Sequence, residues 1–345
     1  MKFGLVPIQQ AAGKILAHNV ARPDGGRLIS KGKPLSSDDL AALRSIGRTN
    51  LYVAEPEPGD VSEDEAASRI GHAICGSHLQ VTRPASGRVN LRAETLGVLR
   101  VEVAHLDRLN EINGLAIATR PANSVIRPRQ TAVTVKIIPF ALPEESVRLA
   151  ERLGAEHEPL LGLHPLPVRR VALVFTGSPW TRQGVIEAFE LPLRTRVEGL
   201  GSCVSALEFI SIEEDDLGEA TLMQTLERLV QESSGLIILA GEMGIMDLQD
   251  AVPRAIERLG GEVTSFGAPV DPGNLLLVAY LGRVPVLGAP GCARSLKPNV
   301  IDWILPRLLI GDRLTRLDIT HLGHGGLLTG LRDENVEGFS PVGLS

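Results

Sequence analysis

The sequence predicts an α/β protein: a C-terminal three-layer domain with a mainly parallel sheet, preceded by a smaller mixed and β-rich N-terminal region. Continuous apolar runs such as VALVFT at 171–176 and GLIILA at 235–240 are typical of strands buried on both faces. The segments between these runs carry apolar residues at helical spacing. Upstream, at 79–140, the apolar runs are short, alternating and separated by glycines and prolines, which is typical of antiparallel strands.

The composition excludes several classes of protein. A chain of 345 residues with 43% hydrophobic and 22% charged residues is long enough for two or three folded domains. A formal net charge of −6 argues against a nucleic-acid partner, whose phosphates require a basic face. No apolar run reaches the roughly 18 residues of a membrane span, and the start has no signal-peptide core. Because three cysteines make no disulfide framework, we expect a reduced cytoplasmic protein without a membrane partner.

The first expected domain is a small mixed α/β unit at 1–58. It contains a short helix with Ser36 or Ser37 as N-cap and Gly47 just past its end. The residues at 50–53 read as a strand.

A β-rich domain is expected at 59–142, followed by a helical segment and linker at 143–167. Ser62 with Glu65 three residues later is a capping-box pattern, which predicts a helix running to about residue 74. Short strands are predicted at 87–93, 97–103, 114–119 and 134–140, with a short helix at about 106–112.

The C-terminal α/β domain is expected at 168–315, with a tail at 316–345. Its apolar strands alternate with amphipathic helices, which indicates a sheet covered on both faces. We expect strands at 171–176, 204–211, 235–240 and 262–267, a hairpin at 275–288, and helices at about 183–199 (interrupted by Pro192), 222–230, 251–259 and after 302.

In such a sheet, ligands bind at the carboxyl ends of the strands. Four glycine-containing loops fall at this edge, where glycine lets the backbone approach a ligand. Any one of them is more often an ordinary strand-to-helix turn, and spacing alone names no ligand. The candidate residues are Thr176, Gly177 and Ser178; Gly241 and Glu242, in the loop that ends with Asp247 and Asp250; Pro272, Gly273 and Asn274; and Pro290, Gly291, Cys292, Ser295 and Lys297.

Charged residues in these loops have two readings each. Asp247 and Asp250 could cap the helix that follows them, or could hold Mg²⁺ together with a ligand phosphate, and Glu242 could join them. Lys297 and Arg294 could contact a phosphate or oxyanion, although solvated surface bases are as common.

Cys292 and two histidines complete the candidates. A helix N-terminus would lower the pKa of the Cys292 thiol, but a nucleophile needs a paired base, so we interpret this residue as lining the site. His321 and His324 are three apart, as in some metal sites, but without a third ligand a structural tail is the commoner explanation.

Three stretches resemble the molybdopterin-binding domain shared by molybdopterin adenylyltransferases and molybdopterin molybdenumtransferases. They are VALVFTGS, LAGEMGIMDLQDAVPRAIERLGGEV and APVDPGNLLLVAYLGRVPVLGAPGCARSLKPNVIDWILPRLLIGD, within about 168–312. The Pro-Gly-Cys-Ala-Arg-Ser turn at 290–295 is similar to a subgroup of stand-alone molybdopterin-binding proteins and of domains fused to cytidylyltransferases. The N-terminal AAGKILAHNV and GKPLSSDDLAALRSIG resemble the leading region of such proteins more weakly. The resemblance implies that a pterin phosphate binds across the loops at the strand ends.

The chain departs from this family at the loops themselves. The usual Gly-Gly-x-Ser-x-Gly-x-x-Asp loop corresponds to 241–250, where Asp250 matches the closing Asp but the double glycine and the serine do not match. The usual Lys-Pro-Gly-Lys-Pro loop is DPGNL at 271–275, without either lysine, and Pro-Gly-Asn-Pro is PGCA at 290–293. These departures favour pterin binding over turnover.

The resemblance implies a molybdopterin-binding protein of molybdenum cofactor biosynthesis, with two functions left open. In the first, the chain inserts molybdenum from molybdate into (adenylylated) molybdopterin, with Asp247 and Asp250 as the catalytic carboxylates that hold Mg²⁺. In the second, it is a non-catalytic carrier or chaperone serving a nucleotidyltransferase, such as a cytidylyltransferase, or a molybdoenzyme. A nucleotide-binding regulatory module ranks lower because no P-loop pattern is present. The resemblance also implies a homo-oligomer.

Overall fold

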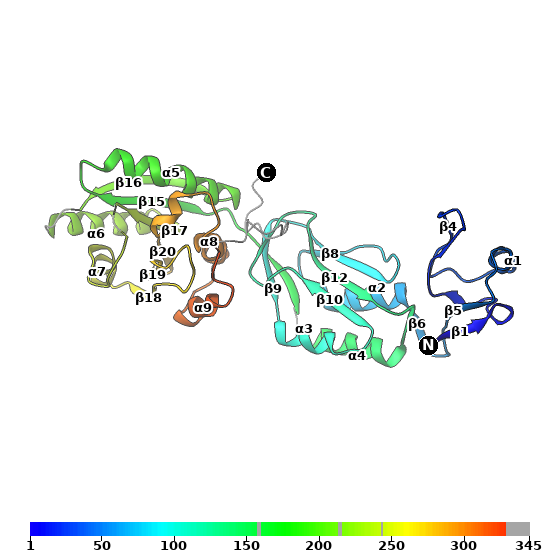
Figure 1. Cartoon of the computed structure of the whole chain (residues 1–345). Helices are drawn as coiled ribbons and strands as arrows, with labels where there is room; N and C mark the ends of the chain where they lie inside the picture. The colour runs from blue at the N-terminus through cyan, green and yellow to red at the C-terminus, as the bar shows by residue number, and fades with distance from the viewer. Residues whose placement is uncertain (157–159, 213–215, 243, 329–345) are drawn as a thin grey trace. The chain divides into compact units, whose positions relative to one another are not determined.

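The computed structural model describes residues 1–156, 160–212, 216–242 and 244–328. The chain folds as two compact units (Figure 1). The first consists of Met1–Thr95, Leu99–Ala122 and Ile126–His164, and the second of Leu96–Val98, Asn123–Val125 and the chain from Pro165 onward. Helices and strands mix throughout, so the predicted α/β class is confirmed. The expected domains at 1–58 and 59–142 and most of the segment at 143–167 thus belong to one unit.

The N-terminal part of the first unit is a small antiparallel sheet with one α-helix, α1 (Ser37–Ser45). The side chain of Ser36 accepts a hydrogen bond from the Asp39 N–H, and the Asp39 carboxylate accepts one from the Ser36 N–H. This capping box decides between the two predicted N-caps in favour of Ser36. The elements around it are β1 (Lys2–Pro7), η1 (Ile8–Gln10), β2 (Ile15–Leu16), β3 (Val20–Ala21), β4 (Arg27–Ile29) and β5 (Asn50–Glu55), with sheet order β1-β5-β2.

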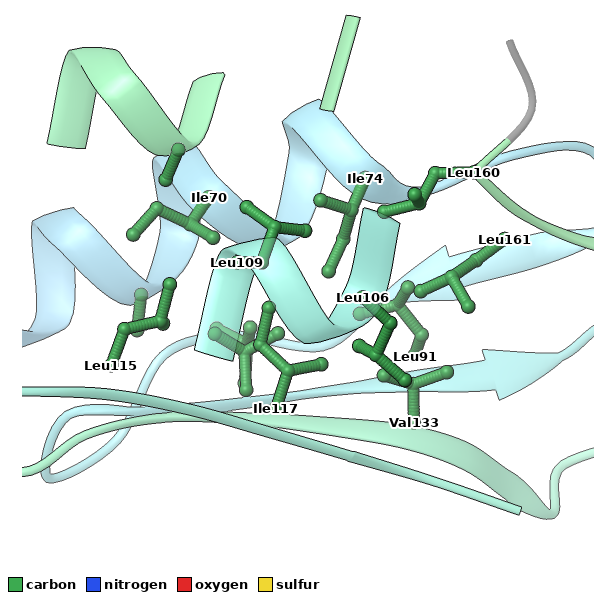
Figure 2. Packing of buried hydrophobic residues seen from close by; sticks show 14 of the residues in the cluster. Ile70, Ile74, Leu91, Leu106, Leu109, Leu115, Ile117, Val133, Leu160 and Leu161 are labelled. Atoms are coloured by element: carbon green, nitrogen blue, oxygen red, sulfur yellow. The ribbon is translucent and has the colours of Figure 1, made fainter. Parts of the chain in front are cut away.

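The rest of the first unit is an antiparallel sheet with helices packed against it, and not a domain made of strands alone. Figure 2 shows Ile70 and Ile74 of α2 and Leu109 of α3 in one core with Leu91 and Val133 of the sheet. In the described residues the sheet has the order β10-β12-β8-β7. The elements are β6 (Asp60–Ser62), α2 (Glu63–Ile74), β7 (Leu79–Val81), β8 (Arg88–Ala93), β9 (Gly97–Val101), α3 (Val103–Asn110), β10 (Leu115–Thr119), β11 (Val125–Ile126), β12 (Thr131–Ile137), β13 (Ala141–Pro143), α4 (Glu144–Ala155) and β14 (Leu161–Pro165).

Helix α4 is a packed part of this unit, although its sequence suggested a segment leading to a linker. At Gly154 of α4, an added Cβ would lie 2.8 Å from the carbonyl oxygen of Ala73 in α2, so α4 and α2 are in close contact there. Arg69 of α2 donates hydrogen bonds to both Glu144 and Glu151 of α4. Residues 157–159, which belong to the expected linker, lie outside the described residues.

The second unit is built on a sheet that, in the described chain, has six strands in the order β16-β15-β17-β20-β19-β18. Strands β16, β15, β17 and β20 are parallel, and β19 is antiparallel to both β20 and β18. The predicted mainly parallel sheet is therefore confirmed. Its strands are β15 (Arg170–Gly177), β16 (Cys203–Ser211), β17 (Leu236–Gly241), β18 (Glu262–Phe266), β19 (Leu277–Leu281) and β20 (Val284–Gly288).

Helices cover both faces of this sheet. Phe175 of β15 packs in one apolar cluster with Phe189 of α5, whereas its neighbour Val174 packs in another with Leu226 of α6. Because successive side chains of a strand point to opposite faces, β15 is buried on both sides, as its continuous apolar run predicted. One face carries α5 (Arg182–Gly199), α8 (Ile301–Ile310) and α9 (Arg316–Thr320); the other carries α6 (Asp216–Gln231) and α7 (Ala251–Arg258).

Helix α5 runs through Pro192, so the predicted interruption does not occur. A proline removes one helix hydrogen bond and crowds the preceding turn. Here the ring is buried in the helix face that packs on the sheet. Burial of that apolar face keeps the helix continuous.

The predicted tail at 316–345 is part of the fold up to residue 328. Arg316 of α9 donates to the carbonyl oxygens of Phe266 and Gly267. The N–H of Leu328 donates to the carbonyl oxygen of Asp271, and η3 (His321–Gly323) lies between. Residues 329–345 lie outside the described residues. None of the described helices is both long and apolar enough to cross a membrane.

Candidate functional site

The register of the sheet brings the four predicted loops to one edge. Thr176 of β15 pairs with Gly241 of β17, and Gly288 of β20 pairs with both Leu239 of β17 and Leu277 of β19. The ends of β15, β17 and β20 and the beginning of β19 therefore lie side by side. We call the following segments loop one (176–181), loop two (241–250), loop three (271–274) and loop four (288–297).

Loop one is closed by a carboxylate from loop two. Oε2 of Glu242 accepts from the Ser178 N–H at 3.0 Å and from the Thr181 hydroxyl at 2.6 Å. These bonds, the Thr181 hydroxyl first, lower the pKa of the Glu242 carboxyl below its ordinary value, so the side chain is ionised at neutral pH. At Gly177, a Cβ would lie 2.9 Å from the Thr181 hydroxyl oxygen, so a side chain there would disturb this arrangement.

In loop two the carboxylates bind the loop itself. Asp250 stands at the N-cap position of α7, but its Oδ2 accepts from the N–H groups of Met246 at 2.6 Å and Asp247 at 3.1 Å. Oδ1 of Asp247 accepts from the Gln249 N–H at 2.8 Å. Neither carboxylate caps α7. Within the described ranges no group of three His, Cys, Asp or Glu side chains could hold a metal ion. A Mg²⁺ ion held by one or two of these carboxylates together with a ligand phosphate stays a prediction.

The glycine of loop three is required by the protein interior. Gly273 has φ of 141°, and an added Cβ would lie 2.5 Å from Cβ of Val300. The Val300 N–H donates to the carbonyl oxygen of Pro272 at 3.2 Å, and the Asp271-Pro272 peptide bond is cis. The close approach that the sequence suggested for a ligand is therefore made by Val300. Asn274 is exposed at the same edge.

Loop four is folded around a buried arginine from α5. Arg196 is only 4% exposed; its Nε–H donates to Oδ1 of Asp302 at 2.9 Å. Its Nη2 donates to the carbonyl oxygens of Ser295 at 2.8 Å and Lys297 at 3.0 Å. Sequence reasoning missed this residue. The available signal was its spacing: Arg196 follows Phe189 by seven residues and Leu193 by three, which places it on the buried face of the helix.

Asn299 also stabilises the conformation of loop four. Its side-chain N–H donates to the carbonyl oxygens of Cys292 and Lys297, and its Oδ1 accepts from the Ile301 N–H. Helix α8 begins only at Ile301, so Cys292 lies in the short η2 turn (Gly291–Arg294) and not at the α8 N-terminus. The expected lowering of the Cys292 pKa is wrong, because burial raises the pKa of this thiol. Cys292 is half-buried, which suits a lining residue.

The two basic residues of loop four differ in their contacts. The guanidinium of Arg294 lies 4.8 Å from the ring centroid of Phe189 and donates to the carbonyl oxygen of Glu242. Arg294 thus ties loop four to loop two. The side chain of Lys297 is exposed.

Comparisons with known proteins add a domain match and three distant likenesses. Residues 5–55 match a domain of unknown function, DUF8806. No curated protein matches the chain.

Among solved structures, the chain is similar to a molybdenum cofactor biosynthesis protein from Pyrococcus furiosus, with 11% identity and a TM-score of 0.27. That alignment covers 89% of this chain and 63% of the other, so the chain spans less than two thirds of its length. It is also similar to molybdenum cofactor biosynthesis protein B, with 14% identity over 41% of this chain and 95% of the other, TM-score 0.30. The Mog protein from Mycobacterium ulcerans matches with 16% identity over 40% and 94%, TM-score 0.28. At these TM-scores, any argument about function has to come from the residues of the chain itself.

Proposed function

We propose that the edge of the six-stranded sheet binds molybdopterin and that the chain serves molybdenum cofactor biosynthesis. The observation that carries the proposal is the position of the loops that these sequence stretches form. The three stretches that resemble molybdopterin-binding domains are separated in sequence, and parts of them form loops one, two and four at one edge. Ligand sites of parallel sheets lie at this edge.

The loops offer backbone and hydroxyl groups on a fixed frame. Nothing lies within 4 Å of the position of an added Cβ at Gly291, so a ligand has room to approach the backbone of loop four. Arg196 and Asn299 hold that loop before any ligand arrives. A site that is already ordered loses less entropy when it binds its ligand. We propose that Gly291 contacts the ligand through its backbone groups.

A carrier function is favoured over molybdenum insertion by one specific observation. The carboxylates of Asp247 and Asp250, which would serve the reaction, accept hydrogen bonds from loop two itself. The lysines of the related transferases are absent at 271–275, so less positive charge is available for molybdate there. The chain would then hold the cofactor for a nucleotidyltransferase or a molybdoenzyme.

The binding proposal is tested by titrating the purified full chain with molybdopterin and following the pterin fluorescence. We expect saturable binding with one ligand per chain. If the protein neither copurifies with a fluorescent pterin nor binds added molybdopterin, the proposed function is wrong in both forms.

The choice between the two functions is tested by assaying cofactor formation with molybdate and Mg²⁺. For a carrier, wild type and Asp250→Asn both give no molybdate-dependent product. If the wild type forms cofactor and Asp250→Asn does not, while Asp38→Asn on α1 behaves as wild type, the protein is a molybdenumtransferase.

A further inference from the structure

Loop one presents a tryptophan to solvent at the proposed site. Trp180, in the turn between β15 and α5, is 91% exposed. A tryptophan buries on average much of its large apolar surface, so an almost fully exposed one is unusual. The other tryptophan of the chain, Trp303, is half-buried in α8.

Exposed apolar side chains continue along the neighbouring loops. Met246 and Leu248 of loop two are 66% and 41% exposed, and Leu296 of loop four is 46% exposed. Three of the four loops at this edge therefore carry large apolar groups in solvent. Binding pockets for planar ligands combine such groups with a few polar atoms that fix the orientation.

An ionised carboxylate, that of Glu242, accepts a hydrogen bond from the residue that follows this tryptophan. Trp180 precedes Thr181, whose hydroxyl binds Glu242. Both bonds described for the carboxylate, from Thr181 and Ser178, end on Oε2. Glu242 is exposed, so its Oε1 is available to accept from a ligand. An ionised carboxylate accepts hydrogen bonds and repels anions.

We propose that Trp180 and Glu242 select the heterocycle of the ligand: the indole stacks on a flat bicyclic ring, and Oε1 of Glu242 accepts from its ring N–H and 2-amino group. This inference rests on the proposed function and defines which end of the ligand lies at loop one. The negative charge of Glu242 keeps the anionic end of the ligand away from loop one. That end then lies toward Gly291 in loop four, where the backbone is open to approach.

The test uses two probes with the same bicyclic ring, pterin and lumazine, which carry an amino group and a carbonyl oxygen, respectively, at position 2. Binding to the full chain is measured by isothermal titration calorimetry, and the tryptophan fluorescence is recorded alongside. For the wild type we expect pterin to bind about tenfold more tightly than lumazine, because a carboxylate accepts from the amino group but not from the carbonyl. The pH at which the preference is lost should lie below the ordinary glutamate pKa, since the pKa of Glu242 is lowered.

Three variants separate the contribution of Trp180 to binding from that of Glu242. Glu242→Gln, whose amide still accepts from Ser178 and Thr181, should remove the preference for pterin. Trp180→Ala should weaken both probes about tenfold, as expected for the loss of an aromatic stacking partner, and should abolish the fluorescence change. Trp303→Phe is the control and should bind as wild type. Because Trp180 is exposed, its removal should leave the circular dichroism spectrum and the unfolding midpoint unchanged.

Two outcomes would overturn the inference. If the wild type binds pterin and both Trp180→Ala and Glu242→Gln bind it equally well, the heterocycle lies elsewhere, and the proposed function stands without this assignment. If the wild type binds neither pterin nor molybdopterin, the inference fails together with the proposed function.

Discussion

At the scale of single residues, Arg196 is the group on which loop four depends most. It lies within the apolar face of α5 and contacts Asp302, 106 residues further along the chain. It also turns the carbonyl groups of Ser295 and Lys297 inward. A charge buried in this way is tolerated because the groups to which the guanidinium donates hydrogen bonds are a carboxylate and carbonyl oxygens. The conformation of loop four thus depends on one side chain outside it.

Replacing Arg196 with Met should destabilise the second unit by about 3–5 kcal/mol, since it leaves the buried Asp302 carboxylate without its partner. The measurement is chemical denaturation of the full chain. Arg194→Ala is the matched control on the same helix, where partly exposed i,i+4 pairs with Glu190 and Glu198 are worth about 0.5 kcal/mol or less each. Equal effects of the two substitutions would contradict the role assigned to Arg196.

Gly273 and Gly282 form a second pair for comparison, because both have positive φ but only one is crowded. Gly273→Ala places a Cβ 2.5 Å from Val300 at φ of 141°, whereas nothing lies within 4 Å of the added Cβ in Gly282→Ala at φ of 59°. We expect Gly273→Ala to lower the free energy of unfolding by about 3 kcal/mol or more, and Gly282→Ala by about 1 kcal/mol. Thermal unfolding of both variants checks this. An equal loss in the two would mean that the contact with Val300 is not constraining.

At the scale of secondary-structure elements, the sequence predicted most helices and strands but not always their ends. Two serines, Ser36 and Ser37, stand at the start of α1, and by composition either could be the N-cap. The structure selects Ser36 because Asp39, three residues later, returns a bond to its backbone. Short-range patterns of this kind leave neighbouring positions equivalent until the backbone geometry is known.

Ser36→Ala should destabilise α1 by about 1 kcal/mol, the usual contribution of an N-cap. Ser37→Ala, inside the helix, should change stability little or raise it, because alanine has the higher helix propensity. Urea denaturation of the full chain measures both. A larger loss in Ser37→Ala than in Ser36→Ala would contradict the assigned cap.

The contact between α2 and α4 predicts an acid sensitivity. Hydrogen bonds from Arg69, and then from Arg148, lower the pKa of Glu144 from 4.5 to about 2, and Arg69 also lowers the pKa of Glu151. A carboxyl with a lower pKa in the folded state stabilises the fold above its unfolded pKa, and this stability is lost as pH falls through the folded value. The first unit should therefore lose stability as pH falls from about 4.5 toward 2.

Arg69→Ala should make this loss shallower, because it removes the donor that both glutamates share. The measurement is the urea midpoint as a function of pH. Arg108→Ala, which removes an exposed pair with Glu156, is the control and should keep the wild-type slope. An unchanged slope in Arg69→Ala would contradict the assignment.

At the scale of the whole molecule, local patterns predicted the architecture, whereas long-range contacts determined the site. Apolar runs such as that of β15 reveal a doubly covered sheet because burial on both faces leaves a continuous apolar run in the sequence. The direction of the parallel strands then places loops one, two and four together. The partners of Arg196 and Gly273 leave no such trace, because each contact joins residues far apart in sequence.

The same limit applies to α4 and Glu242. The amphipathic pattern predicted a helix at α4, but it does not name α2 as the surface on which that helix packs. Glu242 was predicted as a companion to two aspartates, whereas the structure pairs it with Ser178 and Thr181. Side-chain chemistry indicates what a residue can bind, and the fold decides which partner is within reach.

The central claim is that the ligand binds at the edge formed by loops one, two and four. Hydrogen–deuterium exchange of the full chain, with and without molybdopterin, tests it most directly. We predict slower amide exchange at 176–181, 241–250 and 288–297 when the ligand is present, and no change at the opposite edge, at 199–203 and 259–262. Protection at the opposite edge, or confined to the first unit, would contradict the account.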